Sequence, residues 1–106
     1  MRMIFRLIPA LAVAAAVLTG PPAMAADPDH GAVLAKRWCA TCHLVEPGQK
    51  QADADVPSFA EIARKSDFTP EKIAFFLLDP HPPMPNFLLS RSDTQDIAAY
   101  IGTLRK

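Results

Sequence analysis

The sequence lacks a second pair of cysteines, an excess of basic residues and, beyond its first stretch, an apolar run of membrane-spanning length. Two cysteines and three histidines in 106 residues do not supply the clustered ligands of a structural zinc site. Eleven basic residues balance eleven acidic ones, which argues against nucleic-acid binding because that function requires a basic face. Signals for β-hairpins and for internal repeats are also missing, so a mainly helical protein is expected.

The first 25 residues have the pattern of a secretory signal peptide. Arg2 and Arg6 give a positively charged start, and an apolar run follows over residues 7–18. That run is shorter than the roughly 20 apolar residues of a transmembrane helix. Ala23-Met24-Ala25 fits a small-residue cleavage site. We therefore expect cleavage after Ala25, with an uncleaved anchor as the alternative.

Cleavage would leave one small domain over residues 26–106. Loss of Arg2 and Arg6 makes this domain slightly acidic, and loss of three of the four methionines leaves Met84 alone. A chain of this length is near the lower limit of what a hydrophobic core stabilises unaided. A bound apolar cofactor would supply the missing centre of the core.

The strongest chemical signal is the motif Cys39-Ala40-Thr41-Cys42-His43. It has the form C-x-x-C-H, the attachment signature of a c-type haem. Cysteines at i and i+3 lie on one helical turn, so both thiols can bond to vinyl groups on one edge of a porphyrin while His43 projects toward the iron. The alternative is a dithiol redox pair. Such pairs usually open a helix in a βαβ unit, and no such pattern is present.

Apolar residues at helical spacing predict a first helix that begins with Asp29 as N-cap and runs into the motif. Gly31 lies within it and costs about 1 kcal/mol relative to alanine. This cost requires a close approach by another segment, for which we expect Tyr100.

Three later helix starts are predicted: a Ser58–Glu61 capping box, Thr69 followed by Pro70, and a Ser92–Gln95 capping box. The first of these helices is expected to end near Ser66. The second is expected to stop before Asp79-Pro80 and to bury Ile73, Phe76 and Leu77. The third carries one apolar stripe, made of Ile97, Tyr100, Ile101 and Leu104.

A proline-rich loop precedes the last helix. Its prolines, which exclude helix and central strand, are Pro80, Pro82, Pro83 and Pro85. Such a stiff segment suits the holding of one side chain in a fixed place, and Met84 lies within it. Core filler is the common role of a methionine, but a lone methionine between prolines in a loop is not a typical core position.

Together these features resemble a class I cytochrome c of the small bacterial type. The features, in chain order, are Gly31 eight residues before the first motif cysteine, the Cys39–His43 motif, Pro57 after the following loop, Met84 in its proline-rich loop, and Ala98-Ala99-Tyr100-Ile101 in the last helix. The resemblance covers essentially all of residues 26–106.

The resemblance implies an all-α cytochrome c fold of about four short helices around one covalent haem c. Its iron would be bound by His43 and Met84. A thioether is a soft neutral ligand that raises the potential of haem iron relative to a second histidine. The alternatives are His81 as the second ligand, or Met84 as ordinary core filler. The carbonyl of Pro57 would accept a hydrogen bond from His43 and fix its ring. Asn86 is a possible hydrogen-bond partner of the Met84 sulfur.

The implied function is that of a monomeric periplasmic protein that shuttles single electrons between a donor and an acceptor enzyme and is not itself an enzyme. The alternative is a haem-bearing subunit docked to one dehydrogenase or oxidase complex. A third class, a ligand binder or peroxidase, would leave one iron position open. The sequence leaves undecided whether Trp38 covers the haem edge or only packs nearby. Lys36, Arg37 and Lys50 either steer a partner to this edge or are ordinary solvated charges.

Overall fold

The structure is a computed structural model, which describes Gly20 and residues 25–53, 55–80 and 82–106. Most of the expected signal peptide and His81 lie outside the described residues. The described part contains four helices, α1 (Pro28–Trp38), α2 (Phe59–Arg64), α3 (Pro70–Leu78) and α4 (Arg91–Thr103), and no strand. The all-α prediction is confirmed. None of these helices is long and apolar enough to cross a membrane.

Helix α1 begins two residues earlier than predicted. Its N-cap is Asp27, whose side chain accepts hydrogen bonds from the backbone N–H groups of Asp29 (3.0 Å) and His30 (3.2 Å). Pro28 then occupies the first turn, where its missing N–H costs nothing and its fixed φ suits the helix. The prediction of Asp29 as N-cap was therefore wrong. The helix ends at Trp38, and the motif follows in turns.

Helices α2 and α3 start where the sequence predicts. The Ser58 hydroxyl accepts from the Glu61 N–H (3.1 Å), and the Glu61 carboxylate accepts from the Ser58 N–H (2.7 Å). This reciprocal pairing satisfies two N–H groups at the helix end. Thr69 caps α3 in a similar way by accepting from the Lys72 N–H, at 3.1 Å.

The buried face of α3 differs in part from the prediction. Leu77 is buried and Ile73 half-buried, but Phe76 is 37% exposed. The second buried residue of this helix is Ala74. Ala74 and Leu77 lie one turn apart, and the small alanine allows α3 to pack closely against α4.

Helix α4 begins at a capping box upstream of the predicted one. Its N-cap is Ser90, paired with Asp93 through bonds of 3.0 and 3.1 Å, so the Ser92 assignment was wrong. Leu89, just before the cap, packs against the core and fixes the entry of the chain. The predicted apolar stripe is confirmed, with Ile97 and Ile101 buried.

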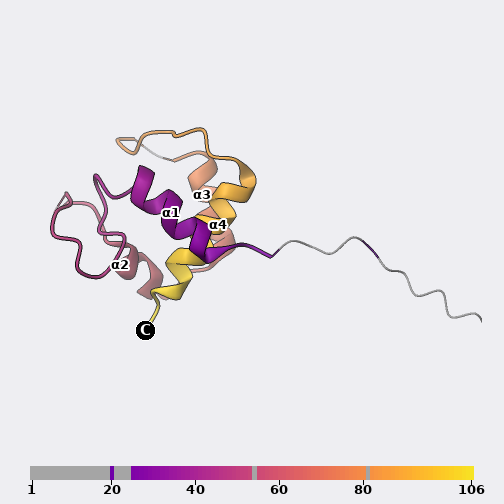
Figure 1. Ribbon diagram of the computed structural model, residues 1–106, viewed down its shortest axis with the longest axis horizontal. Coiled ribbons are helices and arrows are strands. Elements are labelled where there is room, and N and C mark those ends of the chain that lie inside the picture. Colours follow the sequence, from indigo (N-terminus) through magenta and orange to yellow (C-terminus); the bar gives the residue numbers. More distant parts are fainter. Residues whose placement is uncertain (1–19, 21–24, 54, 81) are drawn as a thin grey trace, which may run out of the picture.

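Helices α1 and α4 cross each other, as Figure 1 shows. The point of closest approach includes Gly31. A Cβ atom on Gly31 would overlap the backbone carbonyl of Asp96, so only glycine allows this approach. The packing reason predicted for Gly31 is present, but the segment that crosses it is the Asp96–Ile97 backbone and not Tyr100. Helices α3 and α2 also contact α4, which is therefore the central element of the fold.

Tyr100 instead connects α4 to the segment that follows the motif. Its hydroxyl donates to the carbonyl of Val45 (2.6 Å), and its ring meets that of Phe59 edge-on, with centroids 6.4 Å apart. Burial raises the pKa of the Tyr100 hydroxyl, which therefore remains protonated and able to donate at neutral pH.

We expect Tyr100→Phe to lower the free energy of unfolding by about 1–2 kcal/mol, because it leaves the carbonyl of a buried residue without its donor while keeping the ring. Urea unfolding of the haem-loaded protein measures the loss. Equal midpoints for the variant and the wild type would show that this hydrogen bond contributes nothing to stability.

Candidate functional site

The motif lies in the turns that follow α1. Cys39 caps the helix, with its N–H bonded to the Ala35 carbonyl (2.8 Å), and the N–H groups of Cys42 and His43 return to the Cys39 carbonyl at 3.2 and 2.9 Å. These bonds fold the five residues into one compact turn. The turn places the first thiol in the core and the second at the surface, both of them unbridged.

Burial, with a smaller contribution from nearby Cys42, raises the pKa of the Cys39 thiol to about 11. A dithiol redox pair requires one thiol with a lowered pKa, which supplies thiolate for attack on a disulfide. The raised pKa of Cys39 therefore argues against Cys39 as that attacking thiol.

His43 is oriented by the backbone of a distant residue. Its Nδ1 lies 2.6 Å from the carbonyl oxygen of Pro57, the partner that the resemblance implied. A carbonyl only accepts hydrogen bonds, so Nδ1 carries the proton and Nε2 holds the lone pair available to a metal. The ring also meets that of Phe59, with centroids 5.4 Å apart.

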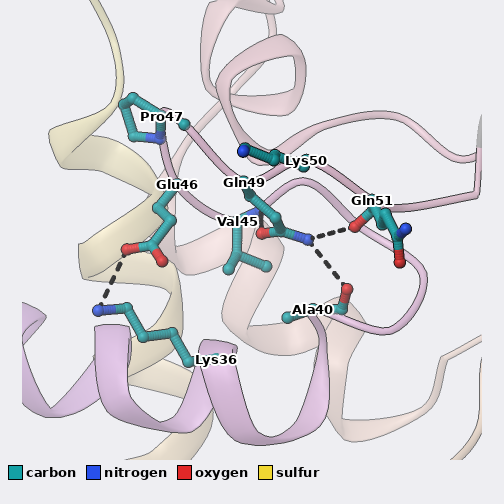
Figure 2. Close-up of a pocket in the computed structure, with 9 residues that line it drawn as sticks. Lys36, Ala40, Val45, Glu46, Pro47, Gln49, Lys50 and Gln51 are labelled. Atoms are coloured by element: carbon teal, nitrogen blue, oxygen red, sulfur yellow. Dashed lines mark hydrogen bonds and ion pairs between the residues drawn. The ribbon is translucent and has the colours of Figure 1, made fainter.

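Gln49 supports the same turn, and sequence reasoning missed it. Its Oε1 accepts from the Val45 N–H (2.9 Å), and its Nε2 lies 3.0 Å from the Ala40 carbonyl and 2.8 Å from the His43 carbonyl. Figure 2 shows the amide reaching across to Ala40 and Gln51. One side chain thus connects the attachment turn by hydrogen bonds to the loop that follows it. A glutamine in a polar stretch gives no sequence signal for this role.

Beside Gln49 lies a shallow pocket whose rim includes Lys36, Glu46 and Lys50. Lys36 Nζ is 3.1 Å from Glu46 Oε2, so this lysine is partly neutralised by a pair at the surface. Arg37 lies over the Trp38 ring, 5.0 Å from its centroid. The predicted steering role of these basic residues stays a prediction.

Met84 lies in the irregular segment between α3 and α4, drawn in orange in Figure 1. It is half-buried and packs against the core cluster that contains Cys39. Within the described residues, Asn86 forms no hydrogen bond to the Met84 sulfur; its Oδ1 accepts from the Leu88 N–H (2.9 Å). Leu88 itself has φ 55°, a conformation that costs energy for a branched side chain.

The residues present fit a covalently attached haem. They supply two free thiols at the attachment spacing, an imidazole whose outer nitrogen is available, and a soft thioether against the same core. Large apolar side chains flank the motif on both sides, with Trp38 37% and Leu44 40% exposed. A flat apolar cofactor can cover such surface.

The fold and the site define a small helical protein that attaches a haem through a C-x-x-C-H turn. Residues 26–101 match the family described as Cytochrome C oxidase, cbb3-type, subunit III. The chain is also 63% identical, over 93 residues, to Cytochrome c-552 of Bradyrhizobium diazoefficiens, a match that covers 88% of this chain and 89% of that protein. No solved structure matches it significantly.

The chain therefore belongs to the class I cytochromes c of the small bacterial type. The predicted family and fold are confirmed, and so is the cofactor, one covalently bound c-type haem with its iron. An electron-transfer cytochrome exchanges electrons with other redox proteins, so such partners are implied.

Proposed function

We propose that residues 26–106 form a periplasmic carrier that shuttles single electrons between redox enzymes, with His43 and Met84 as the two axial ligands of its haem iron. The observation that carries this proposal is the 2.6 Å contact between His43 Nδ1 and the Pro57 carbonyl. It fixes the tautomer and ring orientation that an axial histidine needs. When bound, the haem supplies the one-electron couple.

The side chains of this protein set the conditions for that couple. Cys39 and Cys42 anchor the cofactor, and the Pro57 carbonyl makes His43 a stronger donor through its hydrogen bond. Met84, as a soft and neutral ligand, favours the reduced state and so raises the potential. If His43 and Met84 both hold the iron, no position on it would be left for a substrate, as expected of a carrier and not of an enzyme.

An absorption spectrum of the exported haem-loaded protein, oxidised and reduced, tests this ligation. We expect sharp reduced bands and, in the oxidised protein, the weak far-red band of an iron–sulfur bond to methionine. A spectrum without that band overturns Met84 as the ligand. Carbon monoxide binding to the reduced form then distinguishes an open position from ligation by His81.

Removal of residues 1–25 belongs to the same proposal, which rests on the charged start, apolar run and cleavage site of the sequence. The intact mass of the protein recovered from the periplasm shows whether residues 1–25 have been removed. A mass equal to residues 26–106 plus one haem supports cleavage after Ala25. A mass that retains the first residues would instead support a membrane-anchored form.

A second candidate function is that of a haem subunit within an oxidase complex. The description of the matching family, a subunit of a cbb3-type oxidase, favours it. Purification from the native host separates the two candidates. A carrier elutes as a monomer, whereas a subunit remains with the larger enzyme through gentle detergent extraction and gel filtration.

A further inference from the structure

Two aromatic side chains join the methionine loop to the helix that leads into the attachment motif. Trp38 is the last residue of α1, and Phe87 lies shortly after Met84. Their ring centroids are 5.5 Å apart, with an interplanar angle of 34°. This separation is within the range where aromatic rings attract each other beyond the area they bury. The Arg37 guanidinium, over the Trp38 ring, adds a cation–π contact.

Side-chain packing supplies contacts between the described residues of this loop and the rest of the fold. Its four prolines have no N–H to donate, and the hydrogen bond from the Leu88 N–H to Asn86 is local. Met84 and Leu89 pack against the core, and Phe87 packs on Trp38. Of these contacts, the one made by Phe87 reaches the residue that directly precedes Cys39.

We propose that Trp38 and Phe87 form a positioning pair that determines how firmly Met84 is held at the iron. The proposal rests on the ligation by His43 and Met84 proposed above. The pair links the methionine loop, which carries Met84, to the end of α1, which leads into the turn that carries His43. If the rings are separated, the loop can move Met84 away from the iron. The crossing of α1 and α4 at Gly31 does not depend on these rings.

Imidazole is a suitable probe, because it competes with a methionine sulfur for ferric iron. The oxidised haem-loaded protein is titrated with imidazole, and loss of the far-red band reports displacement of Met84. We expect Trp38→Ala and Phe87→Ala each to bind imidazole about 5-fold more tightly, the size of effect that one aromatic pair produces. The double variant should bind it no more tightly than either single one, because the two rings act as a unit.

Two kinds of control accompany these variants. Phe75→Ala removes the same side chain from α3, where Phe75 is 80% exposed, and should leave imidazole binding unchanged. Trp38→Phe and Phe87→Tyr keep a ring at each position and should restore wild-type affinity. If Trp38→Ala does not fold, Phe87→Ala decides the matter, with Phe87→Tyr as its control.

Unchanged imidazole affinity in Phe87→Ala would overturn the proposal, since the ring would then pack without positioning the ligand. Independent, additive effects of the two substitutions would also overturn it. A wild-type protein without a far-red band would contradict Met84 ligation itself, and that result is known before any variant is compared. Failure of the positioning role and failure of the proposed ligation are thus distinguished.

Discussion

Gly31→Ala is expected to lower the free energy of unfolding of the haem-loaded protein by about 3 kcal/mol, at the upper end of the usual cost of overpacking. The added Cβ would overlap the backbone carbonyl of Asp96, which cannot move aside as a flexible side chain can. Alanine gains about 1 kcal/mol of helix propensity over glycine, but this gain is smaller than the cost of forcing α1 and α4 apart.

Gly102→Ala provides the matched control, because it is the same substitution within a helix of the same core. A Cβ on Gly102 would meet the Phe68 ring at 3.8 Å, an ordinary contact distance. This variant should therefore be stabilised, by up to about 1 kcal/mol. Urea unfolding of both variants beside the wild type gives the comparison. A Gly31→Ala protein as stable as the wild type would show that the two helices do not cross as closely as described.

Local residue chemistry predicts two of the helix starts correctly. Ser58 with Glu61, and Thr69 with Pro70, mark helices that begin where expected. The α1 and α4 starts were each placed two residues late, because each region holds two capping residues. At α1 the local signal is Asp27 followed by Pro28, the same pattern as Thr69 followed by Pro70, and a tertiary contact adds to it: the Asp27 N–H donates to Asp96 Oδ1 at 2.8 Å.

The residues of the site also differ in whether a local pattern or a long-range contact determines their role. The Cys39–His43 motif is local, so its chemistry is readable from five residues. The contact between His43 and Pro57 spans the following loop, and only the family resemblance indicated it. The hydrogen bonds of Gln49 and the pairing of Trp38 with Phe87 depend on how distant segments meet after folding. Residue type and spacing alone therefore did not predict them.

Asp96→Ala is the second substitution with a large expected effect, a loss of about 2–3 kcal/mol. Asp96 lies on α4, at the crossing with α1, and is only 7% exposed. Its carboxylate accepts from the Asp27 N–H (2.8 Å) and pairs with His30 Nδ1 (2.7 Å), so one side chain connects the start of α1 to α4. Charge-assisted hydrogen bonds of a buried carboxylate are among the costlier ones to lose.

The contacts among Asp27, His30 and Asp96 predict that the stability of the fold depends on pH. Burial by itself would raise the pKa of Asp96, but the bonds from the Asp27 N–H and from His30 outweigh it, so the pKa of this carboxyl lies below its ordinary value of 3.8. The hydrogen bond to Asp96, helped by the charges of Asp96, Asp93 and Asp27, raises the pKa of His30 above 6.5. Asp96 thus contributes stability above pH 3.8 that is lost as pH falls through its folded pKa.

His30 acts in the opposite direction, since its stabilising contribution is complete below pH 6.5 and is lost as pH rises through its raised folded pKa. The wild type should therefore lose stability relative to His30→Gln and Asp96→Asn as the pH rises above 6.5 and through the raised pKa of His30. Asp96→Asn is the sharper variant, because its amide oxygen can still accept from Asp27 while the charge that attracts the imidazolium is gone. His81 is present in all three proteins and cancels in the difference. Parallel stability curves across this pH range would show that His30 and Asp96 are not coupled in solution.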